Sequence, residues 1–146
     1  MAAPTYTWEF AFDLWGDRIP KIQTLEAASG LYTKVGTLLA MASGQCRLAT
    51  DGDGEAIIGL AAEVISVAAT AADPVKVAIL APGMVIKGTS NADASAYTGL
   101  ASKLTDIDAD QSLDPDDQTG GFLSVLRAED AGLTVWCVVT DGALVA

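Results

Sequence analysis

The sequence predicts a mainly β domain, a small β-barrel or β-sandwich with at most one short helix. Three observations support this fold class. Short runs of apolar and β-branched residues follow one another at close spacing, turn residues such as Gly, Asp and Pro separate them, and no long helical pattern alternates with them. At 146 residues, the chain has the size of one domain and can bury a core of its own.

The predicted strands of the body are short and are separated by recognisable turns. Their ranges are 21–25, 37–41, 45–49, 57–61, 75–80, 84–87, 122–126 and 133–139. Ser43-Gly44 has the composition of a hairpin turn, and residues 51–54 have that of a second turn. Upstream, Pro20 steers Ile19 away from helix and so separates the N-terminal segment from the body.

Two segments interrupt this series of strands. A short helix is predicted after Ser90 or Asn91, because the apolar residues that follow share one helical face. That face consists of Tyr97, Leu100 and Leu104. The next segment, 106–121, is rich in Asp and is predicted to be a solvated loop.

The net charge of −11 limits the partners of this chain. It arises from 19 acidic and 8 basic residues, and the basic residues are scattered singly. Nucleic-acid binding needs Lys and Arg to neutralise phosphates, so we expect no nucleic-acid partner. No apolar run approaches the roughly 20 residues of a membrane span, and the N-terminus lacks a signal-peptide pattern. We therefore expect a protein made in the cytoplasm, without a membrane partner.

The chain lacks histidine and has two cysteines. Without histidine, the usual general base at neutral pH and any Ser-His or Cys-His dyad are missing. Cys46 and Cys137 lie in apolar, strand-like surroundings and are predicted to be buried thiols rather than a disulfide. The sequence has no nucleotide-binding glycine loop and no Gly-x-Ser-x-Gly setting, and its acidic clusters lie in turns. We expect a protein that is not an enzyme and needs no cofactor.

Aromatic residues are concentrated at the N-terminus. Five of the nine aromatic residues lie within the first fifteen positions. With a period of two, Trp8, Phe10, Phe12 and Leu14 share one face of a predicted strand, and Trp15 points to the other face. Such a segment is either an arm whose apolar face binds another protein or the first strand of the chain's own sheet.

The segment 106–117 has a spacing similar to that of a calcium loop. Its carboxylates at loop positions 1, 3, 5 and 12 are a weak candidate metal site, formed by Asp106, Asp108, Asp110 and Asp117. The pattern departs from a calcium loop where the geometry is strictest. Gln111 replaces the glycine of the sharp turn, and an Asp replaces the longer, bidentate Glu at the last position. A solvated acidic loop without a metal is the preferred interpretation.

The central body carries a family resemblance. It reads Gly-Glu-Ala-Ile-Ile-Gly-Leu-Ala-Ala-Glu over residues 54–63 and continues through an Ala-rich loop to Val-Lys-Val-Ala-Ile-Leu-Ala-Pro-Gly-Met-Val-Ile-Lys-Gly over residues 75–88. This pattern resembles the head decoration, or capsid cement, proteins of tailed bacteriophages, of the lambda type. The segments 36–45, 121–127 and 133–139 also suit that family, whereas the acidic segment 106–119 has no counterpart that we can match.

The resemblance implies a β-tulip-type domain that assembles as a homotrimer on the outside of the mature capsid. Its partner would be the major capsid protein of the expanded shell, and its place the exterior of the virion. The family's N-terminal arm adds a strand to a capsid sheet. On this basis residues 1–18 are expected to be the arm and residues 19–146 the decoration domain. The expected capsid-binding residues are Trp8, Phe10, Phe12, Leu14 and Trp15, although Trp15 could pack on the body instead.

Two other functions stay open at this point. One is a small β module that binds carbohydrate or protein, with or without calcium at the acidic loop. The other lies within phage biology and is a tail or fibre subunit. The sequence does not separate either of them from the decoration role.

Overall fold

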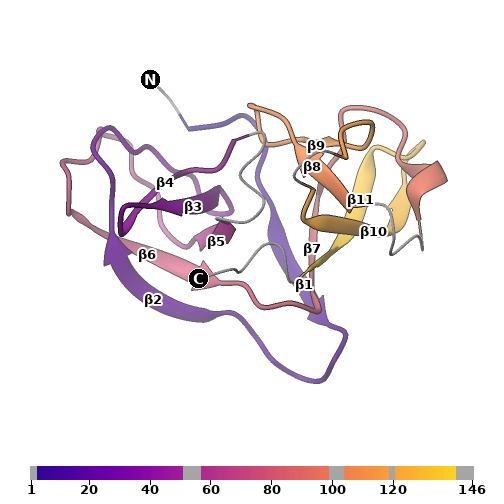
Figure 1. Cartoon of the computed structure of the whole chain (residues 1–146), viewed down its shortest axis with the longest axis horizontal. Helices are drawn as coiled ribbons and strands as arrows, with labels where there is room; N and C mark the ends of the chain where they lie inside the picture. The colour runs from indigo at the N-terminus through magenta and orange to yellow at the C-terminus, as the bar shows by residue number, and fades with distance from the viewer. Residues whose placement is uncertain (1–2, 51–56, 99–103, 119–120, 141–146) are drawn as a thin grey trace.

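The computed structural model describes residues 3–50, 57–98, 104–118 and 121–140, which form two antiparallel sheets (Figure 1). The six-stranded sheet has the order β1 (Glu9–Asp13), β7 (Met84–Thr89), β11 (Thr134–Val139), β10 (Leu123–Glu129), β8 (Leu104–Ile107) and β9 (Leu113–Asp114). The five-stranded sheet has the order β2 (Lys21–Glu26), β6 (Pro74–Ile79), β5 (Ile57–Ala61), β3 (Leu38–Ala42) and β4 (Gln45–Leu48). The predicted mainly β fold is confirmed, and neither sheet closes into a barrel.

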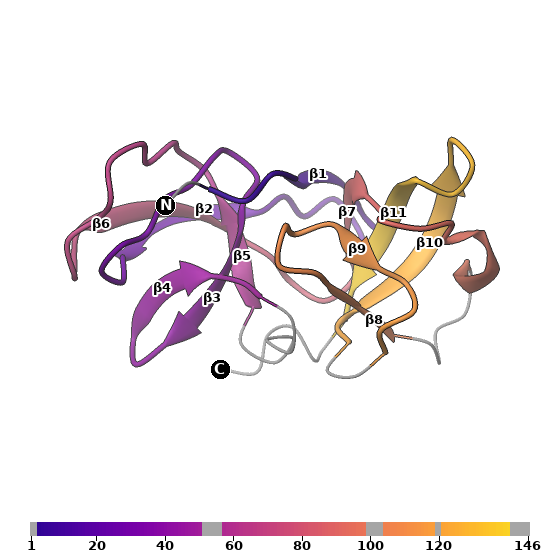
Figure 2. The same ribbon diagram turned by 90° about the horizontal axis from the view of Figure 1, so that it is seen from above.

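The two sheets form two lobes that lie side by side along the longest axis of the molecule (Figure 2). Each sheet curls, and isolated bridges mark where its ends approach each other. Ala27, just after β2, forms a bridge with Cys46 of β4, and Ser90, just after β7, forms one with Leu113 of β9. The chain crosses from one sheet to the other between β1 and β2 and again between β6 and β7.

The β3–β4 hairpin shows how local sequence sets the register. Ser43 and Gly44 both have positive φ, 52° and 79°, as the type I′ turn of a two-residue hairpin requires. Ala42 therefore pairs with Gln45, and Met41 pairs with Cys46. The turn predicted at Ser43-Gly44 is confirmed, whereas the turn predicted at 51–54 lies outside the described residues.

The five-stranded sheet is apolar on both faces because it serves two cores. In β3, Leu38 and Ala40 contribute to a large core that includes residues of both sheets, whereas Leu39 contributes to a second core within the five-stranded lobe. In β5, Leu60 and Ala61 divide in the same way. Alternate residues of a strand point to opposite faces, so a strand with a core on each side reads as a continuous apolar run.

Two predictions about the segment after β7 are corrected. Within the described residues, the expected helix is reduced to one 3-10 turn, η2 (Ser95–Tyr97), and Leu104 begins β8, whereas Leu100 lies outside the described residues. The expected solvated loop is largely folded into the protein. Ile107 and Leu113 are fully buried in the large core, and residues 113–114 form β9. Ile107 pairs with Leu113, so the acidic residues between them form the tip of a short hairpin.

Both cysteines are buried free thiols, as predicted. Cys46 contributes to the core of the five-stranded lobe, and Cys137 contributes to the large core. Burial raises the pKa of each thiol above its usual value, because a thiolate is poorly solvated in an apolar environment. Both thiols are therefore held in their protonated, weakly nucleophilic form.

Candidate interaction surface

Trp8 is buried inside the folded chain. Its side chain is 2% exposed, and its indole Nε1 donates a hydrogen bond of 2.8 Å to the carbonyl oxygen of Gln111. A Cβ at Gly88 would lie 2.5 Å from the indole ring, so glycine is needed where the ring packs on β7. Trp8 is thus unavailable on the surface, which corrects the expectation that it is a capsid-facing anchor.

The residues after Trp8 form a strand of the chain's own sheet. β1 pairs with β7 in antiparallel register, with Glu9 opposite Lys87 and Phe10 opposite Ile86. Phe10 is half-buried and packs against the large core. Over residues 9–13, the segment predicted as an arm is therefore integrated in the six-stranded sheet, which was the alternative interpretation of the sequence.

An irregularity at Ala11 separates the buried half of this segment from an exposed half. The register of β1 on β7 shifts between Phe10 and Phe12, so Phe12 does not continue the inward face of Phe10. A bulge of this kind redirects the side chains that follow it. Phe12 is 44% exposed, and the strict alternation assumed from the sequence fails at this point.

The chain then makes a turn that is held by one ion pair. The Arg18 guanidinium donates two hydrogen bonds to the Asp13 carboxylate, from Nε to Oδ2 at 2.7 Å and from Nη2 to Oδ1 at 2.9 Å. Nη2 also donates to the carbonyl oxygen of Pro82, in the β6–β7 connection, at 2.7 Å. The hydrogen bond from Arg18 lowers the pKa of Asp13 to about 2, because it favours the charged carboxylate.

Trp15 lies on the outside of this turn. Its indole covers Gly83, where a Cβ would come within 2.6 Å of the ring, and the Arg18 guanidinium lies 5.3 Å from the ring centroid. The side chain nevertheless stays 68% exposed. Trp15 thus packs one face on the body and presents the rest of its ring to solvent.

Large apolar side chains are exposed throughout the segment from Phe12 to Ile22. We call this set the N-terminal apolar strip; it consists of Phe12, Leu14, Trp15, Ile19 and Ile22. Ile19 and Ile22 are 75% and 54% exposed and were not among the predicted site residues. The exposure of Ile19 could have been predicted from the sequence, because Ile19 precedes Pro20 in a turn, where a side chain has no core to pack into.

The strip runs along two sheet edges. β1 is the first strand of the six-stranded sheet, and β2 is the first strand of the five-stranded sheet. β2 pairs with β6 over six consecutive residues without a register shift, and all of its side chains except that of Leu25 are exposed. An edge strand with a regular register is a template for another strand, because its outer backbone groups are not paired within the sheet. The irregularity at Ala11 makes β1 a poorer template than β2.

Gln111 is a structural residue that the sequence interpretation placed in a solvated loop. Its side chain is fully buried and spans from the acidic segment to β3. Oε1 accepts a hydrogen bond from the Leu38 backbone N–H at 2.7 Å, and Nε2 donates to the carbonyl oxygens of Leu38 and Ala49 at 2.8 and 3.0 Å. Its φ of 66° is a left-handed backbone conformation, so Gln111 makes the kind of sharp turn for which a calcium loop uses glycine.

The structure does not gather the candidate calcium ligands around one point. Asp106 is fully buried and its Oδ1 accepts from the Ile107 N–H at 2.7 Å, whereas Asp110 Oδ1 accepts from the Ser112 hydroxyl at 2.6 Å. Asp108 accepts from the Ala109 N–H, and the Asp117 N–H donates to a backbone carbonyl. Among the residues that the structure describes, no group of three acidic or cysteine side chains is placed to hold a metal ion.

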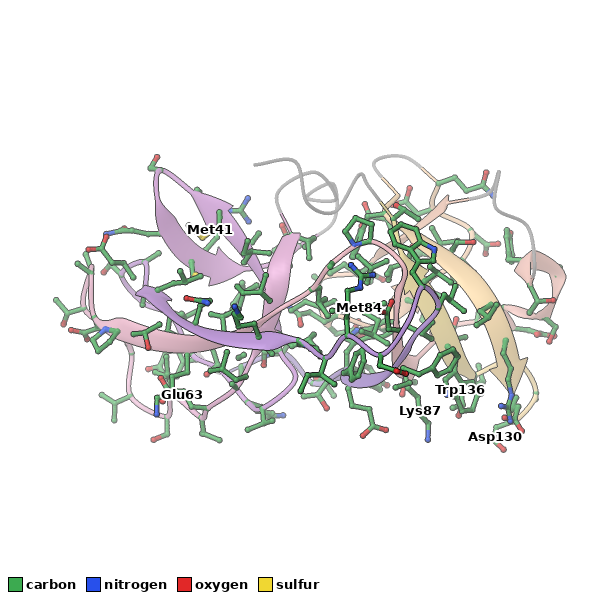
Figure 3. The ribbon with its side chains drawn as sticks, turned by 90° about the horizontal axis from the view of Figure 1, so that it is seen from below. Met41, Glu63, Met84, Lys87, Asp130 and Trp136 are labelled. Atoms are coloured by element: carbon green, nitrogen blue, oxygen red, sulfur yellow. The ribbon has the colours of Figure 1, made fainter. Side chains whose placement is uncertain are left out.

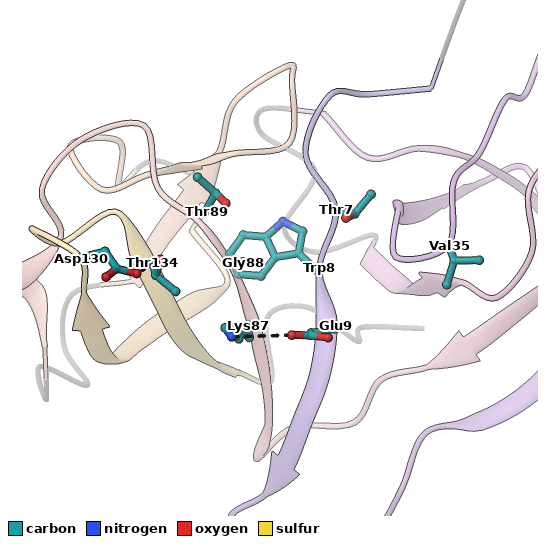
Figure 4. A pocket seen from close by; sticks show the side chains of 9 residues that line it. All are labelled: Thr7, Trp8, Glu9, Val35, Lys87, Gly88, Thr89, Asp130 and Thr134. Carbon is teal, nitrogen blue, oxygen red and sulfur yellow. Dashed lines mark hydrogen bonds and ion pairs between the residues drawn. The ribbon is translucent and has the colours of Figure 1, made fainter.

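A polar groove of about 530 Å³ lies between β1, β7 and the β10–β11 hairpin (Figure 4). Glu9 and Lys87 form an ion pair in its lining, with Lys87 Nζ 3.9 Å from Glu9 Oε1, and Asp130 lies on the other side of Lys87 from Glu9. Beside the groove, Trp136 is held between two cations, with Lys87 Nζ 5.2 Å and Arg127 Cζ 4.4 Å from its ring centroid. These cations lie on the two strands that flank β11. Because both already contact the Trp136 ring, the ring is a weak platform for stacking of a sugar.

The comparisons with known proteins give no relative for this chain. Within the described residues, no helix is long and apolar enough to cross a membrane. No protein-family model, no curated protein and no solved structure matches the sequence or the fold.

Proposed function

We propose that this chain is a structural protein that binds the outer surface of an expanded phage capsid and joins neighbouring capsomers. The observation that carries the proposal is the N-terminal apolar strip, five large apolar side chains exposed within eleven consecutive residues. Exposed apolar surface of this extent indicates a binding surface. The resemblance of residues 54–88 to capsid decoration proteins supplies the partner, the major capsid protein.

The structure changes how such binding would work. The family's arm becomes ordered on the capsid, whereas here β1 already belongs to the six-stranded sheet. Strand addition would then use the free edge of β2, with Ile22 on the added surface and Trp15 and Ile19 as anchors beside it. Main-chain hydrogen bonds along the edge would give affinity, and the alternating side chains would set the register.

Binding of this kind stabilises the capsid by mass action. A protein that binds the expanded lattice but not the unexpanded one shifts the equilibrium towards the expanded state. If copies act as a homotrimer, several strips bind one lattice together, and their effective concentration strengthens the attachment. No chemical step is involved.

Co-sedimentation with heads of a tailed phage whose own decoration protein is removed tests the proposal. The chain should pellet saturably with expanded heads and should stay in the supernatant with unexpanded heads. The variant Trp15→Ala/Ile19→Ala should bind at least tenfold more weakly, because buried aromatic anchors contribute about 2 kcal/mol or more to an interface. Leu126→Ala, at an apolar side chain on β10 that is 38% exposed, is the matched control and should bind like the parent chain. The proposal would be refuted if the parent chain and both variants bound equally well. It would also be refuted if the parent chain pelleted with neither kind of head.

A second candidate function rests on the polar groove. Its carboxylates and its threonine hydroxyls, at Thr7, Thr89 and Thr134, are groups that bind sugar hydroxyls. Titration with maltose and cellobiose, followed by the chemical shifts of the threonine methyl groups, tests this function. Saturable shifts that are lost in Glu9→Gln would support a glycan-binding module, and the absence of shifts would exclude these two sugars as ligands.

A further inference from the structure

The edge of β2 that faces away from β6 offers a defined set of backbone groups. Ala27, just after β2, donates its N–H to the carbonyl oxygen of Asp73, just before β6, at 2.7 Å. Ala28 donates its N–H in the opposite direction, to the carbonyl oxygen of Cys46 in β4, at 2.8 Å. Successive residues of an antiparallel strand direct their N–H and C=O groups to opposite sides. In β2, the residues that point to the open edge are therefore Ile22, Thr24 and Glu26.

This open edge is accessible to a partner. Figure 1 shows β2 at the margin of the five-stranded lobe, and Figure 3, which views the molecule from below, shows β2 on the viewer's side. All side chains of β2 except that of Leu25 are exposed, and that of Ile22 is 54% exposed. Among the described residues, the backbones of Ile22 and Thr24 form no hydrogen bond outside the pairing of β2 with β6.

The two ends of this edge differ in the groups that they offer. In a parallel bridge, one residue bonds the two neighbours of its partner, so the bridge of Ala27 with Cys46 directs the Cys46 N–H to the Glu26 carbonyl oxygen. Glu26 thus keeps only its N–H for a partner strand. Pro20, at the other end of the edge, has a C=O but no N–H. One end is therefore a donor and the other an acceptor.

Two copies of this edge match in one antiparallel register. When Gln23 of one copy lies opposite Gln23 of the other, Ile22 lies opposite Thr24, and each of these pairs exchanges two hydrogen bonds. The same register brings Glu26 opposite Pro20, where the donor end of one copy meets the acceptor end of the other. Every backbone group of the open edge then has a partner.

The neighbouring registers leave backbone groups without partners. A pairing centred on Ile22 places Thr24 opposite Pro20, which has no N–H for the Thr24 carbonyl oxygen. A pairing centred on Thr24 places Ile22 opposite Glu26, whose carbonyl oxygen already faces the Cys46 N–H. The pattern of donors and acceptors therefore selects the register centred on Gln23.

The side chains are compatible with this register. Lys21 would lie opposite Leu25, and Glu26 opposite Pro20, so no two like charges of β2 face each other across the pair. The charge on β6 lies one strand further from the contact, since Lys76 pairs with Thr24 within each copy. The backbone, and not charge, selects the partner.

We propose that the free chain forms a symmetric dimer through β2, with Gln23 of the two copies facing each other at the two-fold axis. The contact is isologous, because both copies use the same edge, and it joins the two five-stranded sheets into one. It also covers an exposed edge strand that otherwise invites aggregation. The dimer does not rest on capsid binding. A capsid strand that adds to β2 would have to displace the second copy.

Sedimentation velocity over a concentration series tests the dimer. We expect the parent chain to shift from monomer to dimer as its concentration rises. Thr24→Pro removes an N–H that faces the open edge and so spares the pairing with β6. This variant should dimerise at least about tenfold more weakly, because the two-fold axis repeats each lost hydrogen bond. Val67→Pro, at a 79% exposed position in the β5–β6 connection, is the control and should dimerise like the parent chain.

Disulfide cross-linking tests the register. Gln23→Cys should form a disulfide with the same residue of the second copy under mild oxidation, because Cα atoms of such a facing, non-hydrogen-bonded pair are about 4.5 Å apart. Thr24→Cys should cross-link at least about tenfold more slowly, since its two copies lie diagonally, about 7–8 Å apart. The native thiols of Cys46 and Cys137 are buried and do not compete.

Far-UV circular dichroism shows whether each variant is folded, and cross-linking decides the question if Thr24→Pro is not. A parent chain that stays monomeric over its whole soluble concentration range would overturn the proposal, as would equal cross-linking of the two cysteine variants. Either result would leave the proposed capsid binding standing, because co-sedimentation with heads tests that binding separately.

Discussion

Residues 3–10 and residues 12–22 are both rich in large apolar side chains, and they have opposite roles. In the first segment, Trp8 fills a slot between β7 and Gln111, with its backbone N–H bonded to Gly36. In the second, Trp15 rests on Gly83 and stays largely exposed. Composition alone does not distinguish the two segments. The difference comes from the tertiary contacts of each segment. Trp8 packs into a slot formed by distant parts of the chain, whereas the second segment forms an exposed turn.

The first way to sharpen this comparison is to remove Trp8. We expect Trp8→Ala to lower the free energy of unfolding by about 3–5 kcal/mol, because it deletes a buried indole and leaves a cavity. Chemical denaturation followed by far-UV circular dichroism measures the loss. A change of less than about 1 kcal/mol would show that the indole is not part of the core. For the same reason, deletion of residues 1–15 should unfold the chain rather than release a dispensable arm.

Removal of the Gln111 side chain should have the next largest effect. Gln111→Ala leaves the buried Leu38 N–H and the carbonyl oxygens of Leu38 and Ala49 without their side-chain partner. We expect a loss of about 2–4 kcal/mol, since each buried unsatisfied group costs about 1–3 kcal/mol and water relieves part of that cost. Gln118→Ala, at an exposed position, is the control and should leave the denaturation midpoint unchanged.

The Asp13–Arg18 pair predicts a smaller, pH-dependent effect in the exposed segment. The pKa of Asp13 in the folded chain is about 2, below its ordinary value of 3.8. A lowered pKa means that the pair stabilises the fold above about pH 4 and that this contribution disappears as the pH falls from there towards about 2. The difference in free energy of unfolding between the parent chain and Asp13→Asn should therefore shrink over that range. If the difference stayed constant over this pH range, the charge of Asp13 would not contribute to the stability of the fold.

Trp15→Ala should have the smallest effect on stability. A side chain that is 68% exposed contributes little to the core, so we expect a change within about 0.5 kcal/mol in the free energy of unfolding. The comparison with Trp8→Ala in one denaturation series checks this directly. A large loss would place Trp15 in the fold rather than on a binding surface, and it would remove the main anchor of the N-terminal apolar strip.

The fold class and most strands could be predicted because they depend on local pattern. Alternation, the Ser43-Gly44 turn and the apolar runs of β5 and β6 are visible within ten residues of sequence. The acidic segment was misjudged for a different reason. Its Asp residues suggested solvent, but Ile107 and Leu113 pair with each other and are fully buried. A pair of apolar residues on either side of a polar tip produces neither the strand nor the helix periodicity from which elements are predicted.

The surface was predicted only in part, and the reason is again tertiary. Phe12, Leu14 and Trp15 are exposed as a binding segment requires, but Trp8 and Phe10 are drawn inwards. The partners that draw Trp8 inwards are at positions 36, 88 and 111, and none of them identifies itself in the sequence. The register shift between Phe10 and Phe12 depends on β7, which lies more than seventy residues away.

The position of Gln111 also has a consequence for synthesis of the chain. Its hydrogen bonds join residues that are 73 and 103 positions apart in the sequence. Trp8 leaves the ribosome before its hydrogen-bond partner Gln111, which is synthesised 103 residues later. Until then, the whole N-terminal aromatic segment lacks its final packing. A nascent chain in this state exposes apolar surface to other chains, and the contact between Trp8 and Gln111 ends part of that exposure.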